Sequence, residues 1–168
     1  MNTPQLCKTC KKPKANHTCA LCQDSICKSC TQFLTETFSY RKSVPKELTH
    51  SSYCMNCFDQ WVATPLEEYN QVMDKAKEII IYRKDQSKLT RNVNYKADPY
   101  SVEDCEDEEE ALMRMSFFAV EAGHNCLIHV VLSFKKVMDG SHKKAVWAGT
   151  GIPVTIDPTT IRGHMDPP

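Results

Sequence analysis

Four Cys-x-x-Cys pairs in the first 57 residues constrain this chain more than any other feature. The chain has 168 residues and ten cysteines, and eight of the cysteines belong to such pairs. The pairs are Cys7/Cys10, Cys19/Cys22, Cys27/Cys30 and Cys54/Cys57. Disulfide bonds, a redox centre and bound metal are the three chemistries that place cysteines at this spacing.

The rest of the sequence favours metal. No apolar stretch approaches the roughly 18 residues of a membrane span, and the N-terminal "MNTPQLCKTCKKPK" lacks the apolar core of a signal peptide. We therefore expect a cytoplasmic protein, and disulfides are rare in that compartment. A redox centre needs one reactive pair in a βαβ frame, which residues 1–60 do not suggest. Two Zn²⁺ ions, each bound by four thiolates, are the predicted cofactors, with redox and disulfide chemistry as the alternatives.

The spacing also predicts which pairs share an ion. Only four residues separate Cys22 from Cys27, so adjacent pairs cannot close comfortably on one metal. Interleaving the pairs relieves this strain and gives a cross-brace. The predicted ligands are Cys7, Cys10, Cys27 and Cys30 for zinc site 1, and Cys19, Cys22, Cys54 and Cys57 for zinc site 2.

The cysteine spacing and the stretch "NHTCALCQDSICKSC" resemble the FYVE-type zinc finger family over residues 5–60. The resemblance implies a double-zinc finger, here residues 1–62, and recognition of a 3-phosphoinositide headgroup. Only Lys14 and His17 match the family's basic motif before the third ligand, so 3-phosphoinositide membrane binding is not expected. His17 is expected to be a packing or solvated residue. RING and PHD fingers share the cross-brace but normally place histidine at a middle ligand position.

Charge also argues against an anionic partner for the finger. Residues 1–62 carry eight Lys and Arg against four Asp and Glu. Eight thiolates and two Zn²⁺ ions would cancel this excess, so the metal-bound finger has a formal charge near zero. Nucleic acid is therefore not an expected partner.

After Cys57 the composition predicts a helix and then a strand. Thr64 is a candidate cap, Pro65 suits a first turn and Glu67 completes a capping box, which predicts a connecting helix over residues 63–77. The β-branched run 79–81 favours a strand. Residues 85–105 are polar without a sustained period and are predicted to form a long surface loop.

The remaining sequence predicts a helix and a hairpin. The acidic run Glu106–Glu110 suits a helix start, and Gly123 suits its end. Strands are predicted over residues 126–134 and 144–154, with a longer loop around Asp139-Gly140. Alternation predicts one core face, which consists of Cys126, Ile128, Val130, Leu132 and Phe134.

The segments "EEALMRMSFFAVEAGHNCLIHVV" and "VWAGTGIPV" resemble the YbjQ family, sometimes labelled a heavy-metal-binding domain. This resemblance implies a compact α/β domain over residues 78–157 that forms ring-like oligomers. The expected fold class is α+β: a small cross-brace two-zinc finger followed by a compact α/β domain of strand, helix and β-hairpin. Residues 158–168 are predicted to form a flexible tail.

No catalytic motif is present, and we expect a non-enzymatic zinc-binding interaction or adaptor protein with a protein partner of unknown identity. Homo-oligomerisation would use the C-terminal domain. The soft ligands outside the four pairs, Cys105, His124, Cys126 and His129, are expected to be core or surface residues. The alternatives are a RING-like ubiquitin-ligase component that docks through Leu21, Ile26 and Trp61, and a phosphoinositide-binding membrane adaptor.

Overall fold

A computed structural model describes residues 5–35, 38–41, 43–88 and 90–157. The chain divides into two compact units, Met1–Gln71 and Val72–Pro168, which we call the finger unit and the sheet unit. Among the described residues, no helix has the length and hydropathy needed to cross a bilayer. The predicted tail, 158–168, lies outside the described residues.

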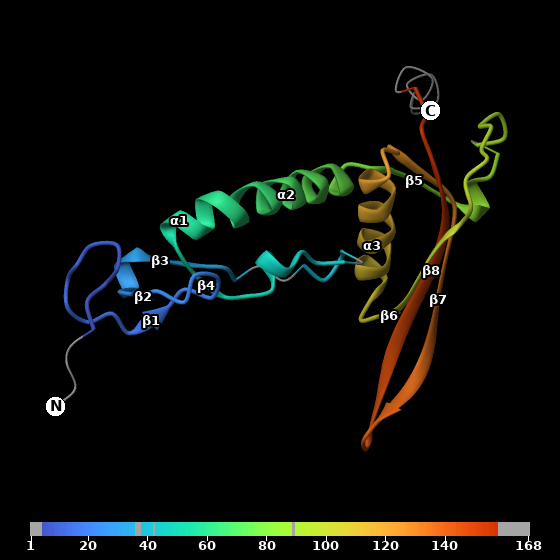
Figure 1. Cartoon of the computed structure of the whole chain (residues 1–168). Helices are drawn as coiled ribbons and strands as arrows, with labels where there is room; N and C mark the ends of the chain where they lie inside the picture. Colours follow the sequence, from blue (N-terminus) through green and yellow to red (C-terminus); the bar gives the residue numbers. More distant parts are fainter. Residues whose placement is uncertain (1–4, 36–37, 42, 89, 158–168) are drawn as a thin grey trace, which may run out of the picture. The chain divides into compact units, whose positions relative to one another are not determined.

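The finger unit is built from very short elements (Figure 1). They are β1 (His17–Thr18), β2 (Ser25–Ile26), η1 (Lys28–Cys30), β3 (Thr31–Phe33), η2 (Lys46–Leu48) and β4 (Ser52–Cys54). β1 pairs with β2 and β3 pairs with β4, both antiparallel. Strands of two or three residues bury little apolar surface, so these hairpins need other support.

Helical structure begins before the predicted connecting helix. It runs from α1 (Met55–Cys57) through the π-helical turn η3 (Phe58–Val62) into α2 (Ala63–Lys77). Cys54 caps it, because its sulfur accepts a hydrogen bond from the backbone N–H of Cys57 at 3.4 Å. The predicted bounds of the connecting helix, 63–77, are those of α2, but Thr64 is not an N-cap because helical structure already precedes it. Pro65 lies in the first turn of α2, the part of a helix that tolerates proline, and shortly after the π-helical turn η3.

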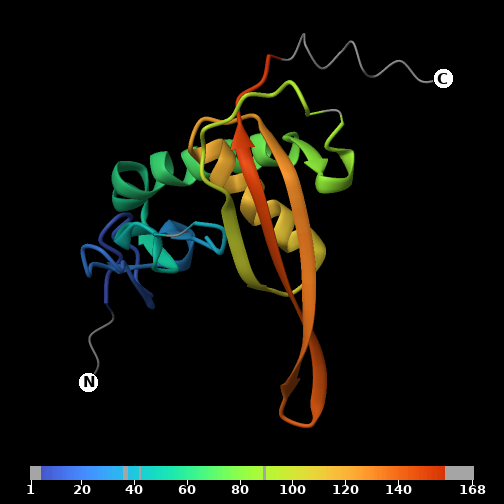
Figure 2. The same cartoon turned by 90° about the vertical axis from the view of Figure 1, so that its right-hand side faces the viewer.

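The sheet unit contains a four-stranded mixed sheet with one long helix. Its elements are β5 (Ile80–Arg83), η4 (Lys84–Gln86), β6 (Tyr100–Cys105), α3 (Glu108–Glu121), β7 (Cys126–Asp139) and β8 (His142–Val154). The strand order is β5-β7-β8-β6. β5 and β7 are parallel, whereas β7 with β8 and β6 with β8 are antiparallel (Figure 2).

Strand β6 corrects the last part of the predicted surface loop over residues 85–105, whereas the described residues between 87 and 99 have no helix or strand. Val102 and Cys105 are buried against the helix, but the residues between them are not. A register shift between these two positions, with Asp104 at a φ of 57°, breaks the alternation of apolar and polar residues. Because of the acidic side chains around the bulge, the sequence of β6 lacks the alternating pattern that indicates a strand.

Helix α3 has the predicted ends and covers one face of the sheet. Asp107 is its N-cap and accepts a hydrogen bond from the backbone N–H of Glu110 at 2.7 Å. Gly123 follows the helix with a φ of 85°, a conformation that glycine adopts without strain. Met115 is fully buried and lies directly over Gly149, where a Cβ atom would come within 2.8 Å of the methionine Cε.

A bulge in β7 overturns the prediction of one continuous core face. The pairing of β7 with β8 shifts between Ile128 and Val131, and His129 has a φ of 54°. Leu127 and Val130 therefore both face α3, although an odd number of steps separates them. Cys126 and Ile128 belong to a smaller cluster on the opposite face, which Val93 also contacts.

The β7–β8 hairpin is longer than predicted. Pairing continues to Asp139 and His142, so the turn consists of only Gly140 and Ser141 rather than a longer loop. Gly140 has a φ of 60°, which suits the first position of a tight two-residue turn. The exposed lysines near the turn give both strand ends a polar sequence, which is why a loop was predicted there.

Candidate metal centres

The structure gathers the eight paired cysteines into two groups of four. Cys7, Cys10, Cys27 and Cys30 form cluster 1, and Cys19, Cys22, Cys54 and Cys57 form cluster 2. Within each cluster the sulfur atoms lie within 4.8 Å of one another, and all ten cysteines are free thiols. These sets are the two that interleaved pairing predicts.

The distances between sulfur atoms fit tetrahedral coordination of one ion in each cluster. Zn–S bonds of about 2.3 Å give sulfur-to-sulfur edges of about 3.8 Å in a regular tetrahedron. The Sγ atoms of Cys10 and Cys27 are 3.6 Å apart, and those of Cys22 and Cys54 are 3.8 Å apart. A disulfide would need sulfurs about 2.05 Å apart. Both clusters could therefore hold a metal ion, and zinc suits four thiolates.

One half of each cluster is a tight turn of the same construction. In cluster 1, the Lys11 N–H donates to the Cys7 carbonyl at 2.8 Å. In cluster 2, the Gln23 N–H donates to the Cys19 carbonyl at 2.9 Å. Lys11 and Gln23 have φ values of 60° and 62°, a conformation that few non-glycine residues adopt. Each turn thus bends the chain back just after its second cysteine.

The other half of each cluster lies at a strand end followed by a helical turn. Cys27 precedes the 3-10 turn η1, and Cys54 caps α1. Such a turn brings the sulfurs of residues i and i+3 to the same side of the chain.

Matching backbone bonds join the two halves of each cluster. The Lys8 N–H donates to the Ser25 carbonyl and the Ala20 N–H to the Ser52 carbonyl, both at 2.9 Å. Lys8 and Ala20 each follow the first cysteine of a tight turn, whereas Ser25 and Ser52 each lie two residues before the partner pair. The two clusters are therefore two copies of one local design, although only the cysteine spacing indicates this in the sequence.

Each cluster holds one thiol that ionises readily. Backbone N–H groups, chiefly that of Cys10, lower the pKa of Cys7 to about 6. For Cys19, burial opposes ionisation, but the backbone N–H groups of Cys22, Cys54 and Leu21 together lower the pKa to about 6. These two thiols would be the first to bind a metal ion, because thiolates and not thiols are the ligands.

Other cluster thiols are held in the protonated form when no ion is present. A hydrogen bond with Cys27 is the largest of several effects that raise the pKa of Cys30 to about 12. Burial is the main effect that raises the pKa of Cys22 to about 11. A divalent ion would reverse this preference, because its charge stabilises neighbouring thiolates directly.

A cavity of about 450 Å³ opens beside cluster 2. Its walls include the cluster cysteines Cys22, Cys54 and Cys57, together with Lys8, Thr9, Asp24, Met55, Asn56 and Asp59. Asp24 lies 3.9 Å from the Lys8 ammonium group and accepts a hydrogen bond from Cys22 at 3.5 Å. Cluster 2 is therefore accessible to solvent at Cys22, which is exposed, whereas Cys19 is fully buried.

The structure gives separate roles to the other residues that the sequence singled out in the finger. His17 packs edge-on against Phe33, with ring centroids 5.4 Å apart, and lies in neither cysteine cluster. Ile26 is fully buried, so it cannot be part of a docking surface for a conjugating enzyme. Trp61 is 52% exposed and remains available, and Leu21 is half-buried.

The soft ligands of the sheet unit are dispersed. Cys126 lies in the cluster on the sheet face opposite α3, and burial raises its pKa to about 12. His129 contacts Tyr95, with ring centroids 5.8 Å apart, and His124 lies 3.1 Å from the Thr155 hydroxyl. Among the described residues, only the two four-cysteine clusters bring metal-ligating atoms together.

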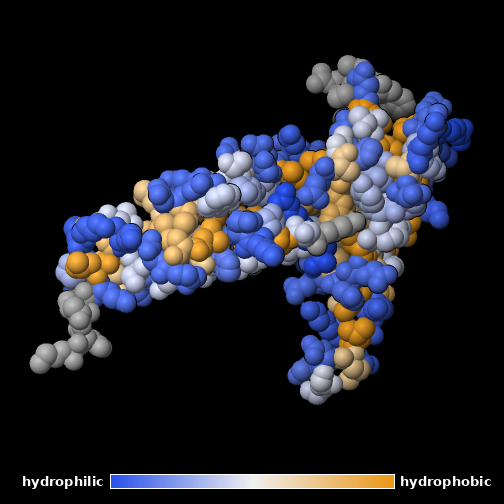
Figure 3. Space-filling view, in the orientation of Figure 1, coloured by the Kyte–Doolittle hydropathy of each residue, from blue (hydrophilic) through white to orange (hydrophobic). Residues whose placement is uncertain are grey.

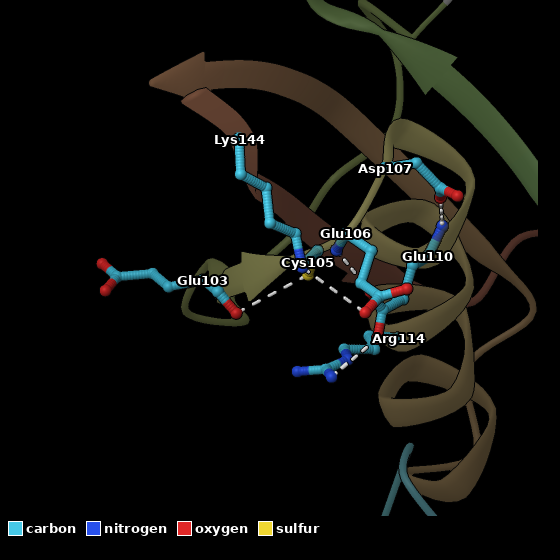
Figure 4. Close-up of polar contacts among 7 residues, drawn as sticks. All are labelled: Glu103, Cys105, Glu106, Asp107, Glu110, Arg114 and Lys144. Atoms are coloured by element: carbon cyan, nitrogen blue, oxygen red, sulfur yellow. Dashed lines mark hydrogen bonds and ion pairs between the residues drawn. The ribbon is translucent and has the colours of Figure 1, made fainter. Parts of the chain in front are cut away.

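Cys105 is held within a polar network at the start of α3 (Figure 4). Its thiol donates to the Glu103 carbonyl at 3.6 Å, and Arg114 forms an ion pair with Glu110 at 2.7 Å. Burial raises the pKa of Cys105, an effect that the nearby Arg114 opposes. The thiol is thus a buried, neutral packing group.

Comparison with protein-family models, curated proteins and solved structures gave no match to this chain.

Proposed function

We propose that this chain is a non-enzymatic interaction protein whose finger unit is held together by two structural Zn²⁺ ions. The observation that supports this most directly is the pair of four-sulfur groups, each with all its sulfurs within 4.8 Å. A site with four thiolates leaves no position open for water or substrate, which is typical of structural rather than catalytic zinc. Each ion would tie two turns that are far apart in the sequence.

A protein partner would dock on the finger surface. Large apolar side chains exposed there include Leu6, Phe33, Met55 and Trp61, at 48–58% exposure.

We assign the finger to the FYVE type with its lipid-binding residues missing, and the sheet unit to a YbjQ-like domain that can oligomerise. Light scattering of the purified protein tests the oligomer.

Elemental analysis combined with native mass spectrometry tests the zinc assignment. We expect two zinc ions per chain. Cys22→Ser should lower the content to one ion, because only cluster 2 loses a ligand. The matched control is the double variant Cys105→Ser, Cys126→Ser, which should retain two ions. One ion in the unaltered protein, or a loss of zinc in the control, would contradict the assignment.

The phosphoinositide adaptor is the second candidate, and it makes a different prediction. Headgroup recognition needs several convergent cations, and only Lys14 and His17 match the family motif, with His17 packed on Phe33. We expect no preference for 3-phosphoinositide vesicles over other anionic vesicles. Saturable binding at physiological salt that His17→Ala abolishes would establish the adaptor function instead.

A further inference from the structure

The outer part of β7 and β8 forms a two-stranded ribbon that leaves the sheet, as Figures 1 and 2 show. β5 pairs with β7 only as far as Val130, and β6 pairs with β8 only as far as Trp147. Beyond these points, within the described part of the chain, Phe134–Asp139 pair only with His142–Trp147. We call residues 134–147 the ribbon. It is roughly 20 Å long at ~3.3 Å per residue.

The ribbon is strongly basic although the chain as a whole has a net charge of zero. Its sequence "FKKVMDGSHKKAVW" contains four lysines and a histidine against one aspartate. The register places Lys136 and Lys143 on one face, and Lys135 and Lys144 on the other. Of these lysines, only Lys144 lies within 4 Å of a described acidic group, the Glu106 carboxylate at 3.5 Å (Figure 4).

Large apolar side chains lie between the charges. Phe134 is 56% exposed and Met138 is 64% exposed, and both share a face with Lys136. Figure 3 shows this mixture of hydrophobic and hydrophilic residues on the part of the hairpin that extends beyond the helix. The Phe134 ring packs against Trp147, with centroids 5.1 Å apart. The ribbon thus presents cations on two faces, and its two most exposed large apolar side chains, Phe134 and Met138, on one.

We infer that the ribbon docks in the major groove of B-form DNA. The groove is about 12 Å wide, admits a two-stranded β-ribbon and has a row of phosphates along each wall. Lysines on both faces of the ribbon match phosphates on both walls. Binding of this kind is dominated by phosphate contacts and carries little sequence preference.

The distribution of charge separates this ligand from other anionic partners. A membrane surface is flat and would meet only one face of the ribbon, leaving two lysines unused. Single-stranded nucleic acid is bound by successive exposed aromatic rings, but Phe134 and Trp147 pack on each other instead. The major groove of an RNA duplex is too narrow for side chains to read. Only a wide groove with charged walls uses both faces of the ribbon.

Acidic residues at the base of the ribbon limit where DNA can lie. Glu103 and Asp104 line a hollow of about 170 Å³ together with Lys135 and Trp147. Their carboxylates would repel phosphates, so the duplex should contact the part of the ribbon beyond Trp147. The expectation that nucleic acid is not a partner rests on the formal charge of the finger, and it does not take account of this local concentration of lysines.

Fluorescence anisotropy with the zinc-loaded full chain and a labelled DNA duplex of about 20 base pairs tests the inference. For about four phosphate contacts, affinity should fall roughly 100-fold between about 50 and about 200 mM salt. Replacing Lys135, Lys136, Lys143 and Lys144 with glutamine should weaken binding at least about tenfold at low salt, because this removes all four contacts. Zinc content and circular dichroism should not change.

A matched variant controls for net charge. Lys28, Lys46, Lys75 and Lys84 are exposed and lie outside the ribbon, so their replacement with glutamine should alter affinity less than about twofold. Equal weakening by both variants would overturn the inference. So would tighter binding to single-stranded DNA, duplex RNA or phosphatidylserine vesicles. No binding to duplex DNA at low salt would mean that the lysines only protect the exposed strand edges from pairing with other chains.

Discussion

The finger unit and the sheet unit obtain a defined structure in different ways. The finger unit has strands of only two or three residues. Its backbone is bent at the cysteines: Cys7 and Cys19 begin the two tight turns, and Cys27 and Cys54 precede helical turns. The sheet unit instead packs α3 over strands of up to 14 residues, around the fully buried Met115 and Leu127. A small unit without a large core needs a metal or a cross-link, whereas a packed layer does not.

This comparison predicts that chelation separates the two units, which is the largest effect that we expect. Metal-binding free energy is folding free energy in small zinc units and amounts to about 10 kcal/mol or more per ion. Removal of zinc should collapse the amide dispersion of residues 5–60 in an NMR spectrum but leave that of residues 90–157 intact. Loss of dispersion in both regions would show that the sheet unit depends on the finger.

The converse change should destabilise the sheet unit without releasing zinc. Met115→Ala removes a fully buried side chain that packs against Gly149 and should cost about 2–5 kcal/mol. Urea unfolding followed by Trp147 fluorescence in a Trp61→Phe background reports on this unit alone, since the chain has two tryptophans. Met138→Ala is the matched control, because Met138 is 64% exposed and should change stability by less than about 0.5 kcal/mol. Zinc loss in the Met115 variant would contradict the separation.

A smaller effect is expected at the start of α3. Asp107→Ala removes the side chain that caps the Glu110 N–H and should cost about 1 kcal/mol, measured by the same urea assay. Glu109→Ala removes a charge from the same helix turn without removing the cap, and should cost only a few tenths of a kcal/mol. Equal costs would mean that charge near the helix end, rather than the capping bond, stabilises this helix.

The last expected effect is a pH dependence of the stability of the sheet unit, which appears only in alkaline solution. Burial raises the pKa of Cys126 from 9.0 to about 12. Above pH 9 the unfolded chain loses this proton while the folded chain retains it, so stability should fall as the pH rises from 9 towards 12. Cys126→Val should reduce this fall relative to the unaltered chain in urea unfolding at several pH values. An unchanged slope would mean that other groups, such as Tyr82, whose pKa is also raised by burial, cause it.

Features set by nearby residues were readable from the sequence. The separation of Cys22 from Cys27 was enough to predict which cysteines lie together, because chain length limits which sulfurs can meet. The ends of α3 were also predicted and confirmed, since Asp107 and Gly123 act through bonds and dihedral angles within a few residues. In each case the physical cause lies within a short stretch of chain.

Tertiary structure decided the features that depend on partners distant in the sequence. The helix begins at Met55 because Cys54 is already fixed in cluster 2, so the capping pattern at Thr64 has no end to cap. The left-handed conformation of His129 shifts the pairing of β7 and changes which residues face α3. β6 forms because β8 offers it an edge, despite its acidic side chains. Strand pairing and register are properties of two segments together, so neither segment specifies them alone.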